Sequence, residues 1–228
     1  EADVQPRAGR LTLMPADLTW DGIQGRVRFD SRKGLQASNL TARFEGRPVD
    51  IEVVPATADQ PARIIQRGVL GSEDIAARLG RDSLPRVVGA LSYVATLTTE
   101  PHLHVALEAD LKDLDVNWPA PLYRPAGDGT MQVDMSRTEP GRWVVRGHLE
   151  NALAWHLLWI EGAFMRGRLQ LGSVSAELPG EAGLVISGQT PVFNLPDWQS
   201  LLADWSEQAP VSTDWPDWLG LVDVQADL

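Results

Sequence analysis

Histidines are the side chains in this chain best suited to bind a metal ion, and one pair stands close together. His102 and His104 are two residues apart in a stretch that alternates polar and apolar residues. At that spacing both imidazole rings leave a β-strand on the same side, so one zinc ion could bind both. Two polar residues on a solvated strand face would show the same pattern, and this simpler reading is favoured. We therefore expect no metal site.

Acidic residues could supply general acids or bases, but their positions favour other roles. Glu73 and Asp74 stand where a helix would begin, and Asp113 and Asp115 lie in a polar segment. Acid–base catalysis needs a converging pocket and a shifted pKa, and neither can be inferred from these pairs. The sequence has no nucleophile elbow, phosphate-binding loop or dinucleotide fingerprint. We therefore expect no enzyme, no catalytic residue and no cofactor.

Charge and composition exclude other classes. The 228 residues carry a formal net charge of −11, and their basic residues, nearly all arginine, form no cluster. A nucleic-acid partner is therefore not expected, because phosphate binding needs clustered positive charge. We interpret the arginines as solvent-facing strand positions. The chain has no cysteine, which excludes a disulfide framework, and its 43% hydrophobic residues are typical of a folded domain.

The elements that must position any site are strands, because period-two alternation dominates the chain. In His102–Leu111 the residues Leu103, Val105, Leu107 and Leu111 share one predicted face, and the polar residues share the other. Together with similar stretches this predicts an antiparallel meander. The other predicted strands are Arg26–Asp30, Leu40–Glu45, Val49–Val53, Arg63–Leu70, Leu91–Thr98, Thr130–Met135, Arg142–Leu149, Met165–Leu171, Val174–Leu178 and Leu184–Ser187, with a turn at Gly46-Arg47-Pro48.

Helical signals are few. A short amphipathic helix is predicted from Ser72, with Gly80 as its stop, and a second over Pro196–Trp205. Residues 117–129, rich in proline and glycine, are predicted to form a loop. The order of elements suggests a first β sub-module over residues 1–83 that ends in the short helix. A second meander over residues 84–228 would carry the Trp-rich C-terminal helix and tail.

Two stretches resemble the AsmA-like proteins. Gly25–Val53 is similar to that family's pattern of a short strand, a loop, and a strand with a Gly-x-Pro-Val turn. Val105–Met135 resembles the YhdP subgroup more closely, because a strand ending in Asp110-Leu111-Lys112 is followed by the loop Trp-Pro-Ala-Pro-Leu-Tyr-Arg-Pro-Ala-Gly. The helix near Trp198 also fits. These matches span most of this chain and a modest part of a full family member.

The resemblance implies a mainly β fold, a curved antiparallel sheet forming an open groove or taco-like half-barrel with two short amphipathic helices. It implies a segment of a periplasmic protein, anchored in the inner membrane of a Gram-negative bacterium, that carries phospholipids between the inner and outer membranes. Partners would be phospholipid acyl chains and the remaining segments of the same chain, with membrane contact made outside this segment. The residues expected to line the groove are Val27, Phe29, Leu40, Phe44, Val49, Ile51, Val53, Leu91, Tyr93, Leu103, Val105, Leu107 and Leu111.

Other functions fit some of the same features. The inward faces could instead pack together as a closed β-sandwich, a structural or protein-interaction module of a large envelope protein. In that case the C-terminal tryptophans, Trp215 and Trp218 among them, would contact a partner. A carbohydrate-binding or hydrolytic β domain is a third and much weaker hypothesis, based on the nine tryptophans.

Overall fold

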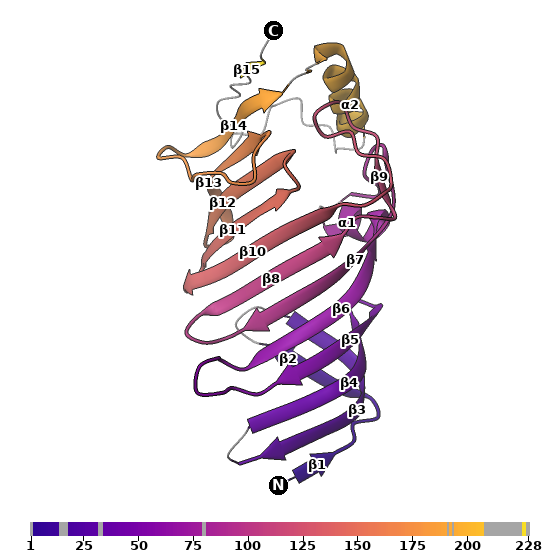
Figure 1. Cartoon of the computed structure of the whole chain (residues 1–228), viewed down its shortest axis with the longest axis vertical. Helices are drawn as coiled ribbons and strands as arrows, with labels where there is room; N and C mark the ends of the chain where they lie inside the picture. The colour runs from indigo at the N-terminus through magenta and orange to yellow at the C-terminus, as the bar shows by residue number, and fades with distance from the viewer. Residues whose placement is uncertain are drawn as a thin grey trace.

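Nearly all strands of the described chain belong to one long, curved sheet (Figure 1). The computed structural model describes residues 2–13, 18–31, 34–78, 81–190, 192, 194–207 and 225–226. Within them the strands and helices are β1 (Ala2–Val4), β2 (Gly9–Leu13), β3 (Leu18–Asp30), β4 (Gly34–Phe44), β5 (Arg47–Val54), β6 (Arg63–Gly71), α1 (Ser72–Arg78), β7 (Val87–Thr98), β8 (Leu103–Asp110), β9 (Leu114–Val116), β10 (Thr130–Glu139), β11 (Arg142–Leu149), β12 (Leu153–Ile160), β13 (Ala163–Leu171), β14 (Gly183–Thr190), α2 (Leu195–Glu207) and β15 (Gln225–Ala226).

Sequential hairpins build the sheet. From β3 to β13 each strand pairs antiparallel with its neighbour in the order β3-β4-β5-β6-β7-β8-β10-β11-β12-β13. The predicted fold class, a mainly β curved sheet with two helices, is therefore confirmed. The turn between β4 and β5 lies at Glu45-Gly46, one residue before the predicted position, because Arg47 and Pro48 already pair in β5.

The last strands depart from the meander. β14 pairs parallel with β13, with Arg166 opposite Gly183, and β15 pairs parallel with β14. A parallel pair needs a connection that returns across the sheet, and residues 172–182, here called the strap, make it. The predicted strand Val174–Leu178 is therefore wrong, because this segment belongs to the strap and has no ladder partner. Ala176 and Leu178 of this segment are half-buried, whereas Val174 is 53% exposed.

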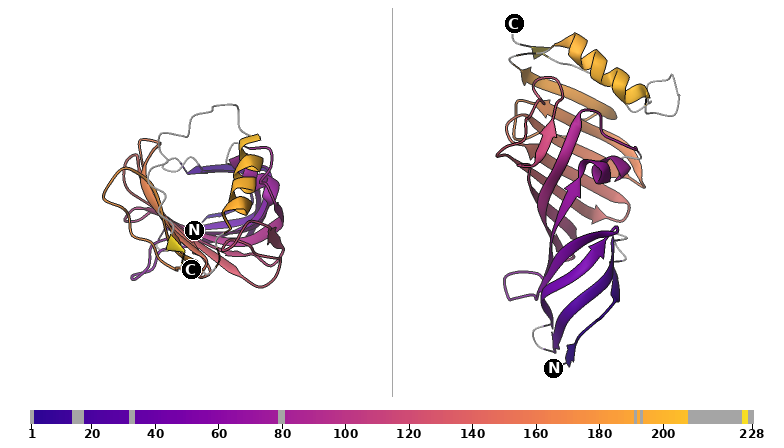
Figure 2. Two further views of the ribbon diagram at one scale, coloured as in Figure 1. Left: turned by 90° about the horizontal axis from the view of Figure 1, so that it is seen from above. Right: turned by 90° about the vertical axis from the view of Figure 1, so that its right-hand side faces the viewer.

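Register divides the side chains of the sheet between two faces, because directly paired residues point to the same side. The face that contains Gln66, Leu107 and Trp155 is called the inner face, and the opposite one the outer face. Seen from above, the sheet curls around the inner face (Figure 2). A central row of paired residues crosses the inner face from β4 to β14: Leu40, Ile51, Gln66, Ala95, Leu107, Val133, Gly147, Trp155, Leu169 and Ile186.

Buried side chains gather on the inner face of the N-terminal half. One cluster joins Trp20 and Ile23 to the inner residues of β4 and β5. Another lies beneath α1, where Ala76 is fully buried with Leu91 and Tyr93. Both clusters follow from the alternation, since burying one apolar face removes it from water while the polar face stays solvated.

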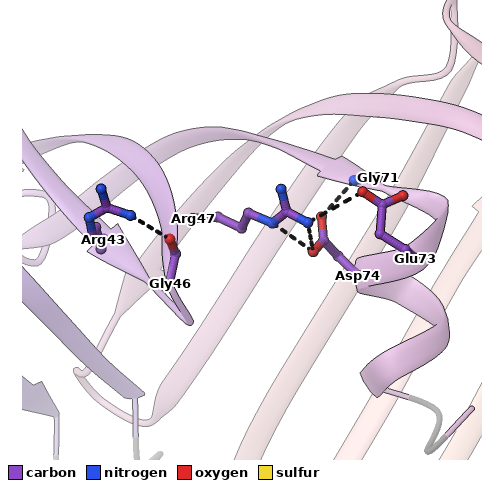
Figure 3. Close-up of polar contacts among 6 residues, drawn as sticks. All are labelled: Arg43, Gly46, Arg47, Gly71, Glu73 and Asp74. Atoms are coloured by element: carbon purple, nitrogen blue, oxygen red, sulfur yellow. Dashed lines mark hydrogen bonds and ion pairs between the residues drawn. The ribbon is translucent and has the colours of Figure 1, made fainter. Parts of the chain in front are cut away.

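An arginine connects the β4–β5 hairpin to α1 (Figure 3). Arg47 pairs with Asp74 at 2.7 Å and with Glu73 at 3.3 Å. Asp74 also accepts a hydrogen bond from the Gly71 N–H, at the junction of β6 and α1. These contacts fix the start of α1, whose predicted position is confirmed.

Some predictions remain open. The predicted helix stop Gly80 and the tail residues Trp215 and Trp218 lie outside the described residues. The division into sub-modules at residue 83 falls between β6 and β7, which pair with each other along Arg63–Gly71. That division stays a prediction.

Candidate functional site

The residues predicted to line a groove lie on the inner face, and most of them are buried. Leu40, Val49, Ile51, Leu91 and Leu103 belong to packed clusters. Phe29, near the N-terminal end of the sheet, is 50% exposed. The buried set further includes Tyr93, Val105 and Leu111, and the partly buried set Val27, Phe44, Val53 and Leu107. Contact of these residues with lipid stays a prediction.

A pocket of about 300 Å³ occupies the middle of the inner face. Its walls come from strands far apart in the sheet, from Trp20 on β3 to Trp143 on β11. Strands so distant line one pocket because the sheet is curved and the N-terminal part of β3 bends over it. Apart from Gln66 and the Tyr93 hydroxyl, the lining side chains are apolar: Leu18, Phe44, Ile64, Leu70, Ala95, Leu97, Val105, Leu107 and Met135 complete it.

The inner face continues beyond the pocket into the C-terminal half, which the predicted lining did not include. Val133, Val145, Trp155 and Leu157 lie there and are half-buried. The rows on either side of the central row are also free of charged side chains. Their members are Val53, Ile64, Leu97, Val105, Met135, Val145, Leu157, Gly167 and Leu184 on one side, and Val49, Gly68, Tyr93, Ala109, Met131, Leu149, Leu153, Leu171 and Gly188 on the other.

The outer face has the opposite character. On β8 and β10, His104 contacts Asp134, while His102 precedes the strand. On β11 and β12, Arg146 donates a hydrogen bond to His156 at 3.1 Å. Among the described residues no group of three or more His, Cys, Asp or Glu side chains could hold a metal ion. One face is therefore apolar and uncharged, and the other is polar, over most of the sheet.

The sequence that forms this two-faced sheet matches a known protein family. A family model described as YhdP protein matches residues 1–228. The chain belongs to the YhdP family. YhdP proteins are bacterial envelope proteins related to lipid transport and are not known as enzymes. No curated protein and no solved structure gives a significant match. In the described part of this YhdP-family chain, every helix is too short or too polar to cross a membrane.

The family-like loop between β9 and β10 is organised by a buried arginine. Arg124 is 8% exposed, and its guanidinium donates to the carbonyl oxygens of Leu111, Leu114, Pro125 and Gly127 at 2.6–3.4 Å. The interpretation of the arginines as solvent-facing strand positions is wrong for this residue. Its burial could not be inferred from local sequence, because it depends on carbonyl groups up to 13 residues away.

The same loop positions α2 of the YhdP-family chain. The Trp198 indole donates to the carbonyl of Ala120 at 3.1 Å, and Arg86 pairs with Asp204 at 2.7 Å and donates to Ser200. Leu201 is buried. The predicted helix over Pro196–Trp205 is confirmed as part of α2, and the loop sets its place near the C-terminal end of the sheet (Figure 1).

The strap is tied to the outer face through a titratable residue. Burial lowers the pKa of His156, the nearby Arg146 guanidinium lowers it further, and a hydrogen bond to the backbone of Ala176 on the strap opposes both. Arg168 is the directly paired residue on β13. Arg166 holds the strap a second time, by donating to the Gly180 carbonyl at 2.9 Å.

Acidification should therefore destabilise the chain through His156. The neutral form is favoured in the folded state, so unfolding takes up a proton as the pH falls below about 6.5, and stability is lost from there down through the folded pKa. We expect the urea midpoint of the His156→Gln variant to fall less between pH 7 and pH 5 than that of the unsubstituted chain. Identical pH slopes for both proteins would contradict this role of His156.

Proposed function

We propose that this chain is a section of a periplasmic conduit that carries phospholipids between the inner and outer membranes of a Gram-negative bacterium. The acyl chains would lie against the inner face of the sheet. The observation that supports this most strongly is the set of uncharged, mostly apolar rows that runs perpendicular to the strands from β8 to β14. The inner-membrane anchor and the rest of the conduit would belong to other segments of the same protein.

The energetics of such a site need no specific polar contact. Each methylene moved from water to an apolar surface gains about 0.8 kcal/mol, so partial cover of one acyl chain gives several kcal/mol. Neighbouring strands offer similar surfaces, for example at Val133 on β10, Val145 on β11 and Leu157 on β12. A lipid can then shift along the groove with little change in free energy, and no nucleotide is required at this section.

The buried clusters of the N-terminal half favour a second candidate, a structural module. Trp20 is 2% exposed, and Leu97 and Leu103 are 5% exposed, so protein side chains already fill this part of the inner face. If the C-terminal half closed in the same way, the chain would only space or dock its neighbours in the envelope. The half-buried state of Val145 and Trp155 is the reason to prefer the lipid-binding proposal.

Adjacent valines on β11 offer a matched test. Val145 lies on the inner face and Val144 on the outer face, and both are half-buried. The chain and its Val145→Asp and Val144→Asp variants are purified from bacterial cells, and bound lipid is measured by native mass spectrometry and lipid extraction. We expect Val145→Asp to reduce co-purified phospholipid roughly tenfold or more, because an acyl chain would have to desolvate the carboxylate. Val144→Asp should retain it.

Two results would contradict the proposal. One is an unsubstituted chain that purifies as a lipid-free monomer and takes up no lipid from vesicles. The other is equal lipid loss in both variants at equal urea midpoints, which would show that the face carrying the charge does not matter. Either result would favour the structural module.

A further inference from the structure

The N-terminal part of β3 folds across the inner face. Bulges interrupt the pairing of β3 with β4 between Asp21 and Gln24 and between Gln24 and Arg26. Gly25 permits the bend: its φ is +131°, and an added Cβ would lie 2.7 Å from Cδ2 of Leu40. Bulges bend a strand and increase its twist. Trp20 and Asp21 still pair with Phe44 and Arg43 at the end of β4, and the chain before Trp20 runs beyond that strand.

This bent segment, β2 together with residues 18–20, is called the arm. Leu13 and Leu18 of the arm pack against Leu97, Leu103 and Val105 on β7 and β8, which are far from β3 in the order of the sheet. In Figure 1 the indigo strands of the arm cross behind the purple part of the sheet. The arm thus covers the inner face in the N-terminal half.

Trp20 anchors the arm at its inner end. Its indole donates a hydrogen bond to Oε1 of Gln66 at 2.5 Å, and the Gln66 amide donates to the Tyr93 hydroxyl. The Phe44 ring lies 5.7 Å from that of Trp20, between ring centroids. Buried polar groups that satisfy one another in this way hold a single arrangement, so the indole has a defined position on the inner face.

The indole stands at one end of the pocket. Trp20, Leu18 and Phe44 form the wall on the side of β3 and β4, whereas Met135 and Trp143 belong to β10 and β11. From β11 onward the half-buried rows of the C-terminal half continue the apolar surface. A path for an alkyl chain that begins in the C-terminal half therefore ends at Trp20.

We infer that Trp20 is the end wall of the acyl-chain site and determines how long an alkyl chain this section accepts. The inference rests on the proposed lipid binding and adds a specificity-determining residue to it. Removing the indole would extend the site toward Ile51 and Leu40, which lie beside Gln66 in the central row. Longer acyl chains would then bury methylenes that the unsubstituted chain leaves in water.

The test compares chain-length preference. The unsubstituted chain and Trp20→Ala are incubated with vesicles of saturated phosphatidylglycerols that differ only in acyl length, and bound lipid is identified by native mass spectrometry. The expected result for Trp20→Ala is a shift toward longer chains, by about fourfold for each additional methylene that becomes buried. Trp20→Phe keeps most of the wall, so it should not shift the preference.

The outcomes separate the two proposals. If the unsubstituted chain binds lipid and Trp20→Ala has the same length preference, the end wall is refuted while lipid binding stands. If the unsubstituted chain binds no lipid, the proposed function fails and the end wall fails with it. Should Trp20→Ala lose the circular dichroism of the folded chain, Trp20→Leu decides the question by the same measurement, because it also opens the wall.

Discussion

Replacement of Arg124 with methionine is expected to lower the free energy of unfolding by about 3 kcal/mol, since it leaves several buried carbonyl oxygens without a donor. The carbonyls of Leu111, Leu114 and Gly127 all receive hydrogen bonds from this one guanidinium. Urea unfolding followed by tryptophan fluorescence measures the change. Hydrogen exchange should also rise in α2, because Trp198 bonds to Ala120 in the loop that Arg124 holds.

Two further variants test whether the loss of stability comes from the contacts of the Arg124 guanidinium. Arg124→Lys keeps the charge, but one ammonium cannot reproduce the planar set of donors, so an intermediate loss is expected. Arg67 is exposed and pairs with Glu52 at 3.4 Å, so Arg67→Met should change stability by about 0.5 kcal/mol or less. Equal losses in Arg124→Met and Arg67→Met would show that the carbonyl contacts do not organise the loop.

The Gly89→Ala variant is expected to lose about 3 kcal/mol or more. Gly89 has a φ of +107°, and an added Cβ would lie 2.0 Å from the backbone oxygen of Asp113. Left-handed strain and overpacking against a backbone atom act together here. Gly89 lies where β7 changes its hydrogen-bonded neighbour from β8 to β9. Hydrogen exchange should therefore rise first in Leu114–Val116.

Gly46→Ala is the matched control for Gly89→Ala. Gly46 also has a positive φ, +81°, but an added Cβ would have no atom within 4 Å. Only backbone strain remains, so about 1–2 kcal/mol is expected. If both variants have the same urea midpoint, the close approach of Asp113 does not contribute to the stability of the β7–β9 pairing.

The alternation of polar and apolar residues predicted much of the sheet, because the side chains of a strand point to its two faces in turn, a pattern that depends only on neighbouring residues. Leu103, Val105 and Leu111 share a predicted face, and all of them are buried on the inner face. The same signal was present in Arg142–Leu149, whose inner residues Val145 and Leu149 were not assigned to the groove. Trp155 and Trp159 on β12 pair with Gly147 and Trp143, and Trp155 lies on the central row, but no groove residue was predicted on β12.

The strand β12 was not predicted, because both of its faces carry apolar residues. Leu158 is 3% exposed and Ala154 is fully buried on the outer face, on the side where the strap runs. A strand with apolar residues on both faces lacks the alternation of polar and apolar residues. The strap does alternate, at Val174, Ala176 and Leu178, which is the pattern that predicts a strand, although Val174 is 53% exposed and the segment has no ladder partner.

The sequence by itself determined a one-sided β-sheet with two short helices, and its loop motif pointed to the family. Only the tertiary structure decided where the inner face is filled and where it is half-open. The bulges at Gln24 bring Trp20 to Gln66, 46 residues along the chain. The fold of the loop between β9 and β10 brings Arg124 to the carbonyl oxygens of Leu111, Leu114 and Gly127. Curvature accumulates over many strands, so contacts across it depend on bulges and register, which no local period of the sequence records.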